Sequence, residues 1–155
     1  MMPKAAEVLG TWFGCGYSPK APGTAGSLGA LVPAILLWKY AGFPSWSFAI
    51  LAAAAFVPAV WAAGVIAREK GLDDPQIVVV DEVVGLWLTV AGATALNWKS
   101  WVAAFVLFRL FDIWKPWPVN RLERLHGGLG IVADDAMAGI YGALVLFAAG
   151  CFNLY

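Results

Sequence analysis

The chain has 155 residues, of which 61% are hydrophobic and only 13% charged, and its ten acidic and ten basic side chains leave no formal net charge. A soluble domain carries about a quarter charged residues, so this composition excludes an ordinary water-exposed globule and indicates an integral membrane protein. The balanced charge excludes a nucleic-acid partner, which requires a basic surface, and the length predicts a single domain over residues 1–155.

The N-terminal segment is mixed in polarity and ends in a stretch rich in proline and glycine, from Ser18 to Thr24. Such a composition predicts a loop with a fixed course. Lys20, the hydroxyl of Thr24 and the free backbone amides of this loop are candidates for binding a phosphate group. An ordinary turn at a membrane surface fits the same residues equally well.

Two apolar runs then predict membrane helices at about residues 25–42 and 46–67. Each contains one proline, which membrane helices tolerate. The charged turn that follows contains Asp73 and Asp74. These acids could join a metal site, but a solvated turn is the better interpretation.

A third apolar run, over residues 77–98, is interrupted only by Asp81 and Glu82. One acid at a helix start could simply stabilise the helix dipole, but an adjacent pair in a membrane segment points to function. Asp81, Gly85 and Thr89 follow helical spacing. Their small-residue face should let another helix approach closely.

The fourth predicted helix, at about residues 101–115, carries Arg109, Asp112 and Lys115 three residues apart and therefore on one face. Pro116 should end this helix because it lacks a backbone donor. Arg109 could merely neutralise Asp112 in a structural ion pair. Three charges on one membrane face favour a functional site instead.

The last apolar run, over residues 136–155, predicts a fifth helix that Asp134 and Asp135 precede. The glycine-rich stretch at residues 126–130, before these acids, predicts a flexible turn. One of these acids could cap the helix. Asp135 shares a face with Gly139 and Gly142, which favours an inward carboxylate followed by close helix packing.

Five spans place Lys39 and Lys99 on one side and the other eight lysines and arginines on the opposite side. By the positive-inside rule the basic side is cytoplasmic, so the N-terminus lies inside and the C-terminus outside. The sequence therefore predicts an all-α membrane bundle with about five embedded helices. All candidate acids should gather at its cytoplasmic face.

The predicted cluster combines acids with cations. The candidate catalytic and metal-binding carboxylates are Asp81, Glu82, Asp112, Asp134 and Asp135. Without a cysteine or histidine cluster, they suit a hard cation such as Mg²⁺. The candidate phosphate-binding side chains are Lys20, Thr24, Arg109, Lys115 and Arg121. This combination suits phosphoryl transfer, and its depth at the lipid headgroups points to a phospholipid substrate.

Several other chemistries lack their residues. The sequence contains no Cys-x5-Arg, no Asp-x-Asp nucleophile motif, no second histidine and no Asp-Gly-x2-Ala-Arg pattern of lipid phosphotransferases. A small ion transporter or an assembly subunit is the alternative from a different class. An ion pathway, however, should place polar groups across the whole bilayer rather than at one surface. No protein partner is indicated.

The chain resembles the phosphatidylglycerophosphatase A family of bacterial lipid phosphatases. Four sequence blocks carry the resemblance, in family order, at residues 23–27, 81–89, 108–118 and 126–139. The third block, FRLFDIWKPWP, is the most specific. The resemblance implies Mg²⁺-dependent hydrolysis of phosphatidylglycerophosphate to phosphatidylglycerol and inorganic phosphate in the bacterial cytoplasmic (inner) membrane. We favour Glu82 as general base for direct attack by water, with a phospho-aspartate intermediate as the alternative.

Overall fold

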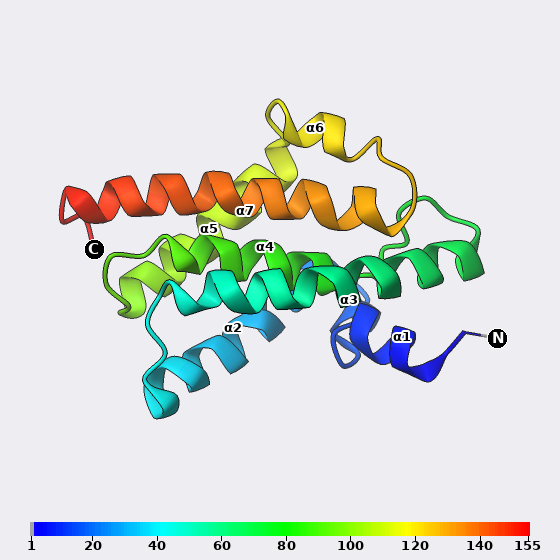
Figure 1. The fold of residues 1–155 in the computed structure, drawn as a ribbon, viewed down its shortest axis with the longest axis horizontal. Coiled ribbons are helices and arrows are strands. Elements are labelled where there is room, and N and C mark those ends of the chain that lie inside the picture. The colour runs from blue at the N-terminus through cyan, green and yellow to red at the C-terminus, as the bar shows by residue number, and fades with distance from the viewer. Residues whose placement is uncertain (1) are drawn as a thin grey trace.

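The computed structural model describes residues 2–155, and every regular element in that range is a helix (Figure 1). The elements are α1 (Lys4–Gly10), the short 3-10 helix η1 (Cys15–Tyr17), α2 (Pro22–Ala41), α3 (Ser47–Lys70), α4 (Val80–Ala91), α5 (Trp98–Trp114), α6 (Val119–Leu122) and α7 (Gly128–Cys151). The predicted all-α class is confirmed. The five predicted helices correspond to α2, α3, α4, α5 and α7, but α4 covers only twelve residues of the predicted run over 77–98.

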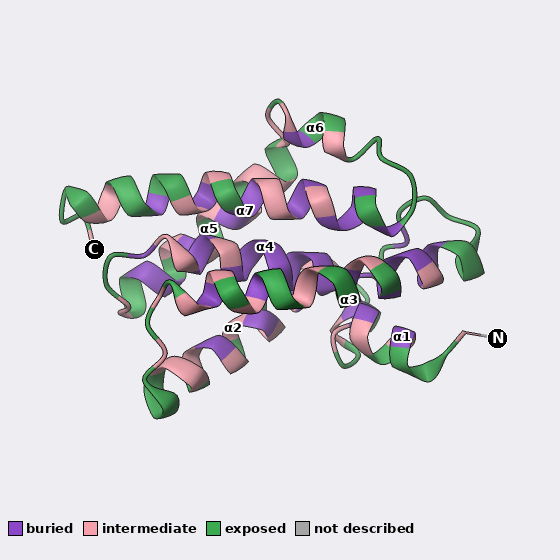
Figure 2. Ribbon diagram, in the orientation of Figure 1, coloured by how far each residue is buried: buried purple, intermediate pink, exposed green. Residues whose placement is uncertain are grey.

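Helix α4 forms the centre of the bundle. It packs against α2, α3, α5 and α7, and ten of its twelve residues are buried (Figure 2). At a rise of 1.5 Å per residue it is about 18 Å long, which is shorter than the hydrocarbon core of a bilayer, about 30 Å. Helix α4 therefore cannot cross a membrane by itself, and its charged first turn, with Asp81 and Glu82, is buried in the bundle.

Small residues hold α4 and α7 together, as their spacing predicted. The hydroxyl of Thr89 donates a hydrogen bond to the carbonyl oxygen of Gly139 at 3.1 Å. A side-chain carbon added at Gly139 would collide with the carbonyl oxygen of Gly85, and one added at Gly85 would lie 2.6 Å from that of Asp135. This close approach brings the acidic start of α4 beside the acids of α7.

Helix α7 begins earlier than the sequence predicted. Asp134 and Asp135 were expected to precede the helix, but they are its seventh and eighth residues, because α7 begins at Gly128. The glycine-rich stretch that suggested a turn is needed for packing instead. A side-chain carbon at Gly128 would meet the carbonyl oxygen of Val60 in α3, so only glycine lets the first turn of α7 approach that helix.

Two other helix ends refine the predictions. The loop expected to extend to Thr24 ends at Ala21, because Pro22 occupies the first position of α2, where its fixed φ and missing N–H are tolerated. Helix α5 ends at Trp114, before Pro116 as predicted, with Lys115 as a left-handed cap at φ 48°.

The outer faces of the bundle are apolar. Helices α3 and α7 are long and apolar enough to cross a membrane by length and composition. Large apolar side chains point outward from all four peripheral long helices, among them Val32, Val57, Val106 and Phe147. The acidic core is therefore enclosed by a hydrophobic exterior.

Candidate active site

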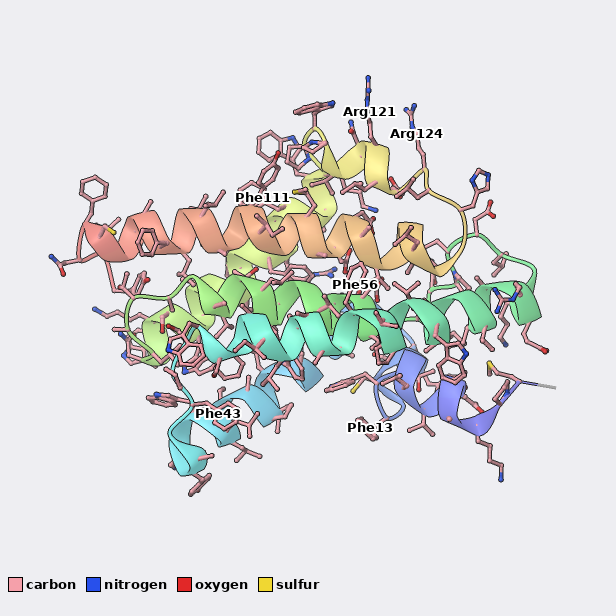
Figure 3. All side chains as sticks on the ribbon, in the orientation of Figure 1. Phe13, Phe43, Phe56, Phe111, Arg121 and Arg124 are labelled. Atoms are coloured by element: carbon pink, nitrogen blue, oxygen red, sulfur yellow. The ribbon has the colours of Figure 1, made fainter. Side chains whose placement is uncertain are left out.

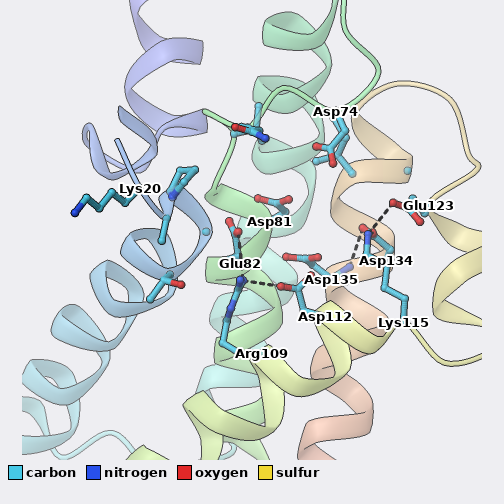
Figure 4. A pocket seen from close by; sticks show the side chains of 18 residues that line it. Lys20, Asp74, Asp81, Glu82, Arg109, Asp112, Lys115, Glu123, Asp134 and Asp135 are labelled. Atoms are coloured by element: carbon cyan, nitrogen blue, oxygen red, sulfur yellow. Dashed lines mark hydrogen bonds and ion pairs between the residues drawn. The ribbon is translucent and has the colours of Figure 1, made fainter. Parts of the chain in front are cut away.

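A pocket of about 350 Å³ opens where the starts of α2 and α4 meet the end of α5 and the acids of α7 (Figure 4). Its wall includes all five carboxylates that the sequence singled out, Asp81, Glu82, Asp112, Asp134 and Asp135. These residues come from three helices and span more than fifty positions of sequence. The fold therefore brings them together in one site.

Three of the carboxylates form a compact group. Asp81, Glu82 and Asp135 each offer an oxygen within 4.8 Å of the other two, and all three residues are buried. Each also has one buried oxygen without a hydrogen-bond partner among the described residues: Oδ1 of Asp81, Oε2 of Glu82 and Oδ2 of Asp135. Unpartnered buried carboxylate oxygens are costly. The convergence of the three carboxylate groups fits a hard cation that takes oxygen ligands, such as Mg²⁺.

Arg109 lies between this group and Asp112. Its Nη1 donates to Oδ2 of Asp112 at 2.5 Å and lies 3.6 Å from Oε1 of Glu82. The ion pair with Asp112 that the sequence suggested as a structural explanation is therefore present, yet the guanidinium also faces the pocket. The first turn of α2 closes over it, since a side-chain carbon at Gly23 would collide with Oε1 of Glu82.

Lys115 is held on the opposite wall. Its Nζ donates to Oδ2 of Asp134 at 2.8 Å and to Oε1 of Glu123 at 2.9 Å, while Oδ1 of Asp134 accepts the backbone N–H of Asp135. Partial burial on its own lowers the pKa of Lys115, but the hydrogen bonds to Asp134 and Glu123 outweigh it and raise that pKa above its ordinary value. The ammonium group therefore stays charged beside the acidic group.

Of the predicted phosphate-binding residues, Lys20, Thr24, Arg109 and Lys115 line the pocket, and Arg121 does not. Arg121 is exposed on α6 and points away from the bundle (Figure 3). The helical spacing of the sequence could not show this, because α6 is a separate four-residue helix whose direction depends on the chain after Pro116.

The structure also adds residues to the pocket wall. Asp74, interpreted from the sequence as a solvated turn residue, is exposed but lines the pocket, together with Gln76 and Glu123. The acidic character of the 73–74 turn was the available signal for Asp74. Nothing in the sequence distinguished Glu123, because its place beside the pocket follows from its ion pair with Lys115, eight residues earlier in the chain.

An acidic, cation-flanked pocket in a helical bundle with an apolar exterior has the arrangement of charges that an enzyme acting on phosphate groups requires. The family model of phosphatidylglycerophosphatase A matches residues 8–150. The chain therefore belongs to the phosphatidylglycerophosphatase A family, as the four sequence blocks predicted.

Two individual relatives carry the name of this family, and a third carries a different name. The chain is 38% identical to phosphatidylglycerophosphatase A of Escherichia coli K12, over 93% of this chain and 83% of the relative. It is 37% identical to phosphatidylglycerophosphatase A of Haemophilus influenzae, over 92% and 86%. It is also 40% identical to a Bacteroides thetaiotaomicron protein named as a candidate phosphatidylinositol-3-phosphatase, over 92% and 91%. No solved structure is significantly similar to the chain.

Proposed function

We propose that the protein hydrolyses phosphatidylglycerophosphate to phosphatidylglycerol and inorganic phosphate, with Mg²⁺ as cofactor, as a step of phospholipid biosynthesis. The observation that carries the proposal is the convergence, beside two cations in one pocket, of three buried carboxylates that each have one oxygen without a hydrogen-bond partner among the described residues. Membership of a phosphatase family favours this activity over the ion transporter or assembly subunit.

The five carboxylates divide into two roles. Asp81, Glu82 and Asp135 would hold the Mg²⁺ ion, because each offers a carboxylate oxygen within 4.8 Å of the other two. When bound, the ion supplies positive charge that stabilises the phosphoryl oxygens during transfer. Asp112 and Asp134, which the sequence also suggested as metal ligands, instead fix Arg109 and Lys115 through ion pairs.

The remaining groups orient the substrate and move protons. Arg109, Lys115 and the hydroxyl of Thr24 bind the terminal phosphate, since charged donors match its oxygens. Glu82 has two carboxylate oxygens, so it can hold the cation and accept a proton from the attacking water. The water oxygen bonds to phosphorus while the bond from phosphorus to the glycerol oxygen breaks. The departing oxygen takes up a proton from solvent water and becomes the hydroxyl of phosphatidylglycerol, while Glu82 returns the proton that it accepted to the solvent.

The five long helices are proposed to be embedded in the cytoplasmic membrane, with the pocket facing the cytoplasm. Lys39 lies in the last turn of α2 and Lys99 in the first turn of α5, at the end away from the pocket. These two ends are adjacent, because the rings of Trp38 and Trp101 lie 6.0 Å apart. The other eight lysines and arginines, on the pocket side by the same topology, satisfy the positive-inside rule.

Native cysteines test this topology. Cys15 precedes α2 and Cys151 ends α7, so a membrane-impermeant thiol reagent added to spheroplasts should label Cys151 and leave Cys15 unlabelled. Each single-cysteine variant, with the other cysteine replaced by serine, serves as the control for the other. Labelling of Cys15 without labelling of Cys151 would reverse the proposed orientation.

Phosphate release tests the activity. Purified protein in neutral detergent micelles should release phosphate from phosphatidylglycerophosphate with Mg²⁺ and stop when the ion is chelated. Phosphatidylinositol 3-phosphate is the second candidate substrate, because one relative carries that activity in its name. Release from that lipid alone would replace the proposed substrate, and release from neither would refute the proposed function.

A further inference from the structure

The three cations that line the pocket are not equivalent. Arg109 and Lys115 are each held by carboxylates within the site. Lys20 is exposed, and across residues 2–155 it makes no ion pair. In Figure 4 its ammonium group extends away from the carboxylates, on the far side of the first turn of α2. Lys20 is therefore a free cation at the pocket mouth rather than part of the acidic group.

Lys20 also follows an aromatic segment with an apolar surface. Phe13 is 74% exposed and Tyr17 is 54% exposed, and Phe13 points outward from the bundle (Figure 3). Trp12 anchors the segment by packing edge-on against Trp87 of α4, with ring centroids 5.8 Å apart. Exposed aromatic rings of this kind lie at the headgroup level of a bilayer, so this segment marks the lipid surface.

The position of Lys20 along the chain links these two environments. It lies three residues after Tyr17 and three residues before Gly23, whose backbone is packed against Glu82 and Arg109. Lys20 therefore lies, along the chain, between the aromatic segment and the pocket wall. A lipid with its terminal phosphate between Arg109 and Lys115 and its acyl chains beside the aromatic segment would extend past this stretch of chain.

Phosphatidylglycerophosphate presents two phosphates along this path. The terminal monoester lies at the end of the headgroup, and a phosphodiester joins the headgroup glycerol to diacylglycerol. We propose that Lys20 binds the phosphodiester of the substrate and that Arg109 and Lys115 bind the terminal phosphate. This proposal rests on the proposed function and assigns Lys20 to a different phosphate from the one the sequence suggested. The site would then select lipids that carry both groups.

The two reaction products separate the two phosphates experimentally. Phosphatidylglycerol contains only the phosphodiester, and inorganic phosphate corresponds only to the terminal group. Each is added as an inhibitor to the Mg²⁺-loaded enzyme in neutral detergent micelles, with phosphatidylglycerophosphate as substrate. Lys20→Gln removes the charge and Lys20→Arg retains it. Lys4→Gln removes the charge of an exposed lysine in α1 that does not line the pocket.

In Lys20→Gln, we expect KM and the inhibition constant of phosphatidylglycerol to rise together by about tenfold, as loss of one charge-assisted contact implies. The inhibition constant of inorganic phosphate and kcat should stay within about twofold in that variant, while Lys20→Arg and Lys4→Gln should resemble the wild type. An equal rise for both inhibitors, no rise for phosphatidylglycerol, or the same rise in Lys4→Gln would overturn the assignment. A wild-type enzyme that releases no phosphate would instead refute the proposed function itself.

Discussion

Replacing Asp135 by Asn tests the metal site through stability as well as activity. The change keeps the shape of the side chain but removes one of three negative charges from a buried group. Two ionised carboxylates 4.8 Å apart repel each other by about 3.5 kcal/mol at an effective dielectric constant of about 20. Asp135→Asn removes two of the three repulsions in the group, those with Asp81 and Glu82.

Proton uptake by the metal-free cluster relieves part of this repulsion. Without metal, the free energy of unfolding of Asp135→Asn should therefore exceed that of the wild type by about 1–3 kcal/mol. This difference corresponds to a Tm higher by about 3–10 °C. The wild type should gain about 2.7 kcal/mol when Mg²⁺ is added at a hundredfold excess over its Kd. Asp135→Asn should lose that gain together with phosphatase activity, because one cation ligand is weakened.

The assay is thermal unfolding in detergent, with and without Mg²⁺, alongside phosphate release. Asp73→Asn is the matched control, because Asp73 is exposed and does not line the pocket. It should behave as the wild type in both measurements. A metal-free Asp135→Asn variant that unfolds at a lower temperature than the wild type, or one that keeps the Mg²⁺-induced shift, would refute the assignment of Asp135 to the metal group.

Four further substitutions test other parts of the structure. Arg109→Gln should lower kcat/KM by about 100-fold or more because it removes a charged donor from the pocket. Arg121→Gln should change kcat/KM by no more than about twofold. Similar losses in both variants would contradict the placement of Arg121 outside the pocket. Gly139→Ala should destabilise the protein by about 1–3 kcal/mol in thermal unfolding, since the added methyl group forces α4 and α7 apart, and an unchanged Tm would contradict the packing. Glu123→Gln should lower activity only about threefold, because this exposed pair contributes little and Asp134 still holds Lys115; complete inactivation would show that Glu123 has a direct role.

Local sequence patterns determined the helices and their packing faces. Long apolar runs were sufficient to predict the five long helices, because hydrophobic length is a property of neighbouring residues. The spacing of Gly85 and Thr89, and of Gly139 and Gly142, predicted a close helix contact on each of these faces, and in the structure the two faces meet each other. The pattern worked because 3.6 residues per turn place such residues on one face. The acidic pairs in apolar segments identified the pocket carboxylates for a similar reason, since charge in such a segment requires a partner.

Only the tertiary structure decided how the charged residues are paired. Sequence spacing placed Arg109, Asp112 and Lys115 on one face. In the structure, however, α5 packs against α7, so Lys115 forms its ion pair with Asp134 of α7 rather than with Asp112 of its own helix. The same packing left Asp81, Glu82 and Asp135 as the group with unpartnered oxygens. Such partners come from different helices, and the distances between helices are not encoded in any local window.

Helix boundaries were the other feature that depended on the fold. The glycines before Asp134 suggested a turn, yet contact with α3 makes them the first turn of α7, which carries both acids into the bundle. For an equivalent reason Arg121 lies outside the pocket and Asp74 lines it. The directions of α6 and of the turn after α3 depend on packing, which the sequence pattern does not show. The sequence by itself thus determined which residue types form the site, and the three-dimensional packing determined their partners.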